Sequence, residues 1–193
     1  MKSAAPLPEK NGLAPSYIWL PEGQWNTLLD FLSSHFPHIE KRVWQQRFAD
    51  GEIRDAQGAL LQEESPAKRG MCVFYYRELE QETPIPFQEH ILFQDEHLLV
   101  VDKPHFLPVT PSGRFVNESL LVRLKKKTGI SDLSPIHRLD RETAGVMLFS
   151  TQKSTRGAYQ ALFQQKEIKK TYHALAPASV SYTHLTLPTK RIV

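Results

Sequence analysis

One segment, residues 136–145 with the sequence Ile-His-Arg-Leu-Asp-Arg-Glu-Thr-Ala-Gly, combines side chains suited to acid–base or nucleophilic chemistry. Its one aspartate, Asp140, stands between Arg138 and Arg141, and the imidazole of a histidine, His137, precedes them. A neighbouring guanidinium favours the ionised form of a carboxyl group and lowers its pKa. An aspartate held ionised beside a rigid strand is a candidate nucleophile. Alternatively, the segment is a charged surface turn whose arginines and carboxylates pair with one another.

The flanking residues place this segment next to a strand. Pro135 precedes it, Gly145 ends it, and the apolar run 146–149 predicts a buried strand immediately afterwards. A protein-kinase catalytic loop also contains His, Arg and Asp, but there the Asp follows the Arg directly and an Asn lies five residues further on. Here Leu139 intervenes and position 145 is glycine, so the kinase class is excluded.

The order His-Arg-Leu-Asp-Arg resembles the signature of the RluA-type pseudouridine synthases, which isomerise uridine within folded RNA. A second pattern, Lys-x-Tyr-x-Ala at residues 170–174, resembles the second signature of that family. The resemblance implies that Asp140 acts at the ribose as nucleophile or base and that Tyr172 packs against the target uracil. On the residue alone, a strand tyrosine is more often a core ring whose hydroxyl reaches water.

The resemblance also implies roles for the other residues of the segment. Arg138 fills the gap left by the extruded nucleotide, because enzymes that act on a base within structured nucleic acid take it out of the stack. His137 fixes the loop by a hydrogen bond, and Arg141 anchors the loop or a phosphate, since a guanidinium binds oxyanions well. The isomerisation changes no oxidation state and needs no energy input, so neither a cofactor nor a metal is expected.

Further elements of the same domain follow from periodicity. Residues 91–104 predict two strands joined at 95–97. This segment ends in a Lys-Pro pair and resembles the segment that begins the family's catalytic domain. The resemblance places Lys103 near the active cleft; alternatively, it is a strand-end lysine whose head reaches solvent. Helices are expected at 118–127 and 151–167, and a strand at 169–175. The first helix ends in Lys125, Lys126 and Lys127, which complement its dipole or contact RNA phosphates.

The N-terminal part predicts a smaller domain. Residues 1–16 are rich in proline and small residues and predict a disordered leader. Helices are expected at 24–36 and 39–49, a hairpin at 52–61 and a strand at 73–77. This arrangement resembles the small RNA-binding domain named after ribosomal protein S-four. Its basic residues are either a solvated face or phosphate contacts; they are Lys41, Arg42 and Arg47.

These elements predict an α+β protein in which a small helix-pair and hairpin domain precedes the first part of a mixed, mainly antiparallel sheet with flanking helices. We expect domains at 17–82 and 83–178. Residues 179–193 match nothing expected of the family and are interpreted as a non-native tail after a C-terminal truncation. The family's His-Gln-Ile-Arg-like motif, whose arginine pairs with the catalytic carboxylate, is absent from the sequence, which leaves the activity of this chain open.

Composition limits the class of protein. The chain has 193 residues, of which 40% are hydrophobic and 23% charged, as in ordinary globular proteins. A net charge of +3 is compatible with a nucleic-acid partner. One cysteine, Cys72, excludes an internal disulfide and suits a reducing compartment, and no apolar run reaches membrane-spanning length. We therefore expect a cytoplasmic monomer that acts on ribosomal or transfer RNA, with no membrane partner.

Two other classes of function stay open from the residues. The first is a catalytically inactive RNA-binding fragment, which would bind RNA in a salt-dependent manner without turnover. The second is a glycoside hydrolase that pairs Asp140 with Glu142. Such enzymes hold two carboxylates across the scissile bond, at least about 5 Å apart. Two carboxylates in one arginine-flanked loop argue against that arrangement.

Overall fold

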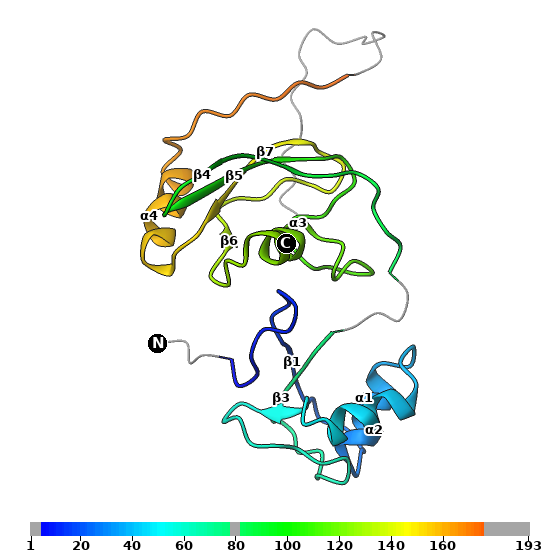
Figure 1. Ribbon diagram of the computed structural model, residues 1–193. Coiled ribbons are helices and arrows are strands. Elements are labelled where there is room, and N and C mark those ends of the chain that lie inside the picture. Colours follow the sequence, from blue (N-terminus) through cyan, green and yellow to red (C-terminus); the bar gives the residue numbers. More distant parts are fainter. Residues whose placement is uncertain (1–4, 78–81, 176–193) are drawn as a thin grey trace, which may run out of the picture.

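The computed structural model describes residues 5–77 and 82–175, which form two domains, one above the other in Figure 1. The first contains β1, α1, α2, β2 and β3, and the second contains β4, β5, α3, β6, β7 and α4. Both sheets are antiparallel throughout. The expected α+β class with antiparallel sheets and flanking helices is therefore confirmed. No helix in the described ranges is long and apolar enough to cross a membrane.

The first domain packs two helices against a small sheet with the strand order β1-β3-β2. Its elements are β1 (Ser16–Trp19), α1 (Leu28–His35), α2 (Lys41–Ala49), β2 (Arg54–Asp55) and β3 (Cys72–Tyr75). The hydroxyl oxygen of Thr27 accepts a hydrogen bond from the backbone N–H of Asp30 at 3.1 Å and so caps α1. Both expected helices are present, but β1 lies where the end of a leader was expected.

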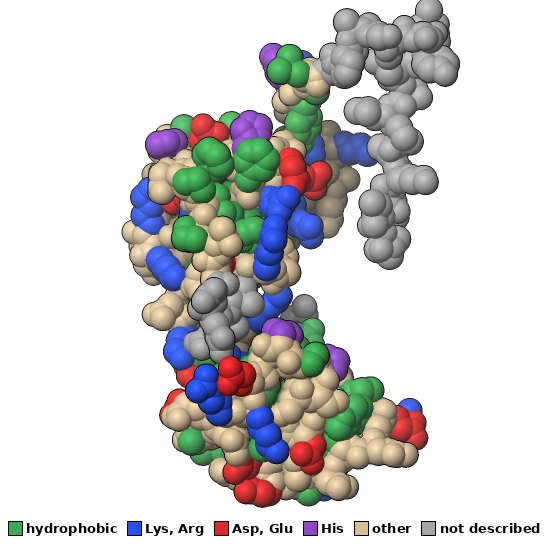
Figure 2. All heavy atoms as spheres, turned by 90° about the vertical axis from the view of Figure 1, so that its right-hand side faces the viewer, with side chains coloured by type: hydrophobic (Ala, Val, Ile, Leu, Met, Phe, Trp, Pro, Cys, Tyr) green, Lys and Arg blue, Asp and Glu red, His purple; other side chains and the backbone are tan. Residues whose placement is uncertain are grey.

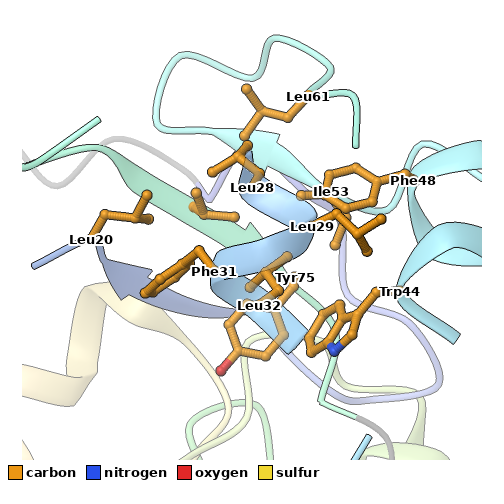
Figure 3. Packing of buried hydrophobic residues seen from close by; sticks show 11 residues of the cluster. Leu20, Leu28, Leu29, Phe31, Leu32, Trp44, Phe48, Ile53, Leu61 and Tyr75 are labelled. Atoms are coloured by element: carbon orange, nitrogen blue, oxygen red, sulfur yellow. The ribbon is translucent and has the colours of Figure 1, made fainter. Parts of the chain in front are cut away.

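The core of the first domain explains why α1 forms where it does. Leu28, Phe31 and Leu32 are fully buried, at the spacing that places three side chains on one helix face. Figure 3 shows them meeting Trp44 of α2 and Tyr75 of β3. The helix pair therefore follows from its apolar spacing, as predicted.

The N-terminal segment differs from the disordered leader that we expected at 1–16. From residue 5 onwards it packs on the folded chain, and Leu7 is buried. The backbone groups of Lys10 and Leu13 pair at 3.0 Å in both directions. The Tyr76 hydroxyl donates to the carbonyl oxygen of Pro8 at 2.7 Å. Burial of one leucine and these specific hydrogen bonds order a segment whose composition alone suggested disorder.

The second domain contains a sheet with the order β4-β5-β7-β6, and one of its faces is packed against α3. Its elements are β4 (His90–Gln94), β5 (Leu98–Lys103), α3 (Leu120–Thr128), β6 (Ser134–Pro135), β7 (Gly145–Ser150) and α4 (Lys153–Gln164). In β5, Leu99, Val101 and Lys103 alternate toward the buried face. The expected hairpin of two strands around 95–97 and both expected helices are present.

The strand that we expected at 169–175 is wrong. Every residue there is exposed, and the described structure gives this stretch no ladder partner. A strand needs a neighbour to accept and donate its backbone hydrogen bonds, and an apolar–polar alternation does not supply one. The interpreted tail, residues 179–193, lies outside the described residues.

Candidate active site

The segment that carries Asp140 forms the connection between β6 and β7. The backbone N–H of Ile136 donates to the Leu148 carbonyl oxygen at 2.9 Å, and so continues the ladder past β6. At the apex, the N–H of Thr143 donates to the backbone oxygen of Asp140 at 3.1 Å. This i to i+3 bond closes a β-turn in which Asp140 is the first residue, a position that favours aspartate. The loop is therefore a structured hairpin end.

The Asp140 carboxylate is exposed, and it does not pair with the arginines beside it in sequence. Arg141 turns to Glu142 instead, with its Nε 2.9 Å and its second terminal nitrogen 2.7 Å from Oε1 of that residue. Arg138 is exposed. Within the described residues no side chain forms an ion pair or hydrogen bond with the Asp140 carboxylate. Neither of the neighbouring arginines therefore pairs with Asp140, and its carboxylate is open to a ligand.

The second carboxylate of the loop has a different character. The hydrogen bond from Arg141 is the main cause that lowers the pKa of Glu142. A glycoside hydrolase needs one carboxyl group that stays protonated as a general acid. Because Glu142 is held ionised, the pairing of Asp140 with Glu142 does not supply that acid.

Lys103 lies beneath the loop and has no exposed surface. Its ammonium group donates to the carbonyl oxygens of Pro104 at 3.0 Å, Leu107 at 2.8 Å and Arg141 at 3.1 Å. The alternative of a strand-end lysine that reaches solvent is wrong, because this geometry uses all three N–H donors on backbone oxygens. Its burial also removes Lys103 from direct contact with RNA. Lys103 instead joins β5 to the Asp140 loop.

The electrostatics of Lys103 follow from this position. Desolvation by burial lowers the pKa of Lys103 to about 8, while the charges of Glu142 and Asp140 act in the opposite direction. The charges of both loop carboxylates therefore act on the buried ammonium group. Its pKa of about 8 lies only a little above neutral pH, so the group is still mostly protonated there.

His137 holds the base of the loop from the other side. Its Nε2 accepts a hydrogen bond from the backbone N–H of Leu148 at 3.2 Å. Its ring stacks on Phe163 of α4, with centroids 4.8 Å apart and planes inclined by 19°. Burial, and secondly the charge of Lys170, lower the pKa of His137. The imidazole is neutral at neutral pH and is used as an acceptor, which suits a role in fixing the loop.

Two residues near the loop carried no signal in the sequence. The ring of Phe115 has the Arg141 guanidinium carbon 5.8 Å from its centre. The ring nitrogen Nδ1 of His105 donates to the carbonyl oxygen of Glu142 at 2.6 Å. His105 directly follows the Lys-Pro pair, but nothing in the sequence indicates that its side chain contacts the loop. Phe115 comes from an irregular loop, where periodicity gives no information.

Tyr172 is not brought to the loop in this arrangement. Tyr172 is 60% exposed, and among the described residues it makes no hydrogen bond or ring contact. The stretch around it pairs with no strand in the described part of the chain. The structure therefore brings together Lys103, His137, Arg141 and the Asp140 turn, and leaves Tyr172 apart.

The basic residues that were candidates for phosphate contacts differ in their surroundings. Lys125 is buried and pairs with Glu9, and Lys126 donates to the amide oxygen of Asn117 at 2.9 Å. Lys127 lies 3.9 Å from Glu89. In α2, Lys41 is exposed, Arg42 pairs with Glu40 at 2.6 Å, and the buried Arg47 guanidinium lies 4.8 Å from the Trp44 ring centre.

Comparison with known proteins identifies the family. A sequence profile described as RNA pseudouridylate synthase matches residues 97–191. An uncharacterised RNA pseudouridine synthase of Synechocystis is 32% identical over 148 residues, which cover 77% of this chain and 50% of that protein. A Helicobacter pylori protein of the same description is 40% identical over 89 residues, covering 46% of this chain and 30% of its own. Over the matched region, the chain belongs to the RNA pseudouridine synthase family.

A further relative and one solved structure are also similar to parts of this chain. The tRNA pseudouridine(31) synthase of Saccharomyces cerevisiae is 32% identical over 51% of this chain and 24% of its own. The structure of human RNA pseudouridylate synthase domain containing 4 aligns with a TM-score of 0.33 and 36% identity, over 40% of this chain and 30% of that one. The chain thus spans half of the length of the Synechocystis relative and less of the others. The profile match includes most of residues 179–193, whose interpretation as a non-native tail stays a prediction.

Proposed function

We propose that the protein to which this chain belongs isomerises uridine to pseudouridine in structured RNA, with Asp140 as the catalytic carboxylate. The reaction breaks the bond between the ribose and N1 of uracil and forms a bond from the same ribose carbon to C5. The proton on C5 leaves and N1 gains one, so that product and substrate are isomers. Family membership over residues 97–191 supports this reaction class.

The observation that carries the proposal is the open carboxylate of Asp140 on a turn whose backbone is held in place. It is exposed at the first position of a closed β-turn, with its charge uncommitted to any described side chain. The buried ammonium of Lys103 and the imidazole of His137 fix the loop from beneath. A nucleophile or base must be accessible to substrate and held in one geometry, and this loop supplies both properties.

The remaining residues take roles around the extruded nucleoside. The exposed Arg138 guanidinium occupies the space left in the RNA stack, and Arg141 contacts a phosphate or keeps the turn in place. Tyr172 reaches the uracil only when the exposed stretch around it moves to the loop. The substrate is ribosomal or transfer RNA, a class to which the name of the yeast relative points, and the enzyme acts as a cytoplasmic monomer.

The test is the Asp140→Asn substitution in the full-length protein, assayed by tritium release from RNA labelled at C5 of uridine. Loss of a catalytic carboxylate lowers the rate on the order of a thousandfold or more, while RNA affinity stays unchanged. Asp132→Asn is the matched control, because the Asp132 side chain is about half exposed and pairs with Lys153 outside the loop. Continued pseudouridine formation by the Asp140 variant contradicts the assignment. RNA binding without tritium release in the unmodified protein points to an RNA-binding protein instead.

A further inference from the structure

A cavity of about 580 Å³ lies between the two domains, apart from the Asp140 turn. This interdomain pocket has arginines from both sides: Arg47 and Arg77 from the first domain and Arg114 from the second. Its volume falls within the roughly 300–1,000 Å³ typical of small-molecule sites. Figure 2 shows lysine and arginine side chains on both sides of the narrowing between the domains.

The described residues that line the interdomain pocket include several basic side chains. Its lining includes three guanidinium groups and the exposed imidazole of His38, and no carboxylate belongs to the described residues that line it. Arg77 also donates to the carbonyl oxygen of Gly113, which joins the end of β3 to the loop that carries Arg114. Arg77 and Arg114, one from each domain, can attract a phosphate, which a guanidinium can bind with two parallel hydrogen bonds.

An exposed aromatic ring stands at the rim of the pocket. Tyr17 of β1 is 61% exposed, although a tyrosine of this size normally buries most of its ring. Its ring centre lies 5.6 Å from that of its cross-strand neighbour Phe74, which supports it from one side. The free face of such a ring is a stacking surface for a nucleic-acid base.

The pocket is connected to the Asp140 turn through one side chain. The guanidinium carbon of Arg114 lies 5.4 Å from the centre of the Phe115 ring, and that of Arg141 lies 5.8 Å from the same centre. The two guanidinium groups are thus within about 11 Å of each other. At about 3.4 Å per stacked nucleotide, this span corresponds to roughly three nucleotides. One RNA strand can therefore reach both places.

We propose that the interdomain pocket binds a nucleotide of the single-stranded RNA adjacent to the target uridine, with the base stacked on Tyr17 and the phosphate held by Arg77 and Arg114. This inference rests on the proposed function, which supplies the RNA. The pocket gives the RNA a second place of contact besides the Asp140 turn, and residues of both domains form it. The pocket selects an unpaired nucleotide next to the modified position, because a base within a duplex cannot stack on a protein side chain.

The test measures binding of a fluorescein-labelled single-stranded RNA of ten uridines to the full chain by fluorescence anisotropy. Tyr17→Ala weakens binding by about fivefold to a hundredfold, the range for loss of one stacked base. Arg114→Gln lowers the slope of log K against log salt concentration by roughly 0.7, the value for one phosphate contact on a single strand. Both side chains are exposed, so the melting temperature is unchanged.

Matched controls use equivalent residues outside the pocket. Trp19 lies two positions along β1, is 60% exposed and does not line the pocket. Arg69 is exposed and pairs with Glu22 at 3.0 Å. Trp19→Ala and Arg69→Gln bind the RNA as the unmodified chain does. Equal losses from Trp19→Ala and Tyr17→Ala, or no loss from Tyr17→Ala, overturn the proposal. Competition by inorganic phosphate as effective as that by uridine monophosphate also overturns it, because the pocket is then an anion site without a base.

The binding assay needs no turnover, so the two proposals fail separately. If Asp140→Asn is active and Tyr17→Ala binds RNA weakly, the catalytic role of Asp140 is wrong and the role of the pocket stands. If Asp140→Asn is inactive and Tyr17→Ala binds RNA as the unmodified chain does, only the role of the pocket is wrong.

Discussion

Replacement of Lys103 by methionine tests whether a buried charge holds the Asp140 loop. Methionine keeps the length of the side chain but removes the ammonium, so three carbonyl oxygens lose their donor. Each such oxygen costs about 1–3 kcal/mol when buried without a partner. The substitution also removes a desolvated charge, which recovers roughly 3 kcal/mol. We expect the variant to be less stable by about 2 kcal/mol at pH 7.

The direction in which the free energy of unfolding changes with pH tests whether Lys103 is desolvated. Its pKa falls from 10.5 in the unfolded chain to about 8 in the folded one. Between these pH values the unfolded chain holds a proton that the folded chain has released. The free energy of unfolding therefore rises with pH in this window, and below pH 8 this group adds no slope. The difference in free energy of unfolding between the original chain and Lys103→Met grows by roughly 2–3 kcal/mol from about pH 7 to about pH 10.

Urea unfolding at both pH values measures this difference. Far-UV circular dichroism is required, because all three tryptophans lie in the first domain, at positions 19, 25 and 44, and their fluorescence does not report on the sheet around Lys103. Lys127→Met is the matched control, because this lysine is about half exposed and its ammonium group lies on the surface near Glu89. If the difference in free energy of unfolding between the original chain and Lys103→Met is constant or shrinks between pH 7 and pH 10, desolvation does not lower the pKa of Lys103.

Two further outcomes follow from local geometry. Gly129 ends α3 at a φ of +71°, where an added Cβ is strained, so Gly129→Ala lowers the free energy of unfolding by about 1 kcal/mol in urea denaturation. Gly157→Ala, inside α4 with open space around it, is neutral or stabilising, and a loss there as large as at Gly129 contradicts the reasoning. The lowered pKa of His137 means that the folded chain binds fewer protons than the unfolded chain just below pH 6.5, so stability falls as pH falls through that window. An NMR titration that follows the imidazole and the Leu148 amide together checks this, and a His137 pKa at or above 6.5 contradicts it.

Much of the fold could be predicted from spacing, because apolar side chains at helical intervals must be buried. Leu28 and Leu32 in α1, and Leu120 and Leu124 in α3, are fully buried as their positions require. The short strands β1 and β6 were missed because two to four residues give too little periodicity. The strand expected at 169–175 failed for the opposite reason: its pattern was suitable, but strand formation depends on a partner elsewhere in the chain.

In the candidate site, proximity in the sequence does not show which residues pair in the structure. Asp140 has an arginine one residue after it, yet Arg141 pairs with Glu142. The β-turn decides this, because the bond from Thr143 to Asp140 fixes the directions in which consecutive side chains leave the backbone. The cation whose pKa both carboxylates raise comes from the distant strand β5, as the buried Lys103. The distance between Lys103 and the loop depends on the pairing of β5 with β7, and the His-Arg-Leu-Asp-Arg motif contains no information about that pairing.

The position of Lys103 also explains how an unpaired carboxylate can be held in place. A surface ion pair would fix Asp140 but would also occupy the oxygens that a substrate must reach. A buried ammonium bonded to the backbone at Arg141 fixes the peptide chain next to Asp140 and leaves its side chain free. The charges of Glu142 and Asp140 in turn help to keep Lys103 protonated against desolvation. The carboxylates of the loop therefore favour the charged form of the ammonium group that holds the backbone of the loop in place.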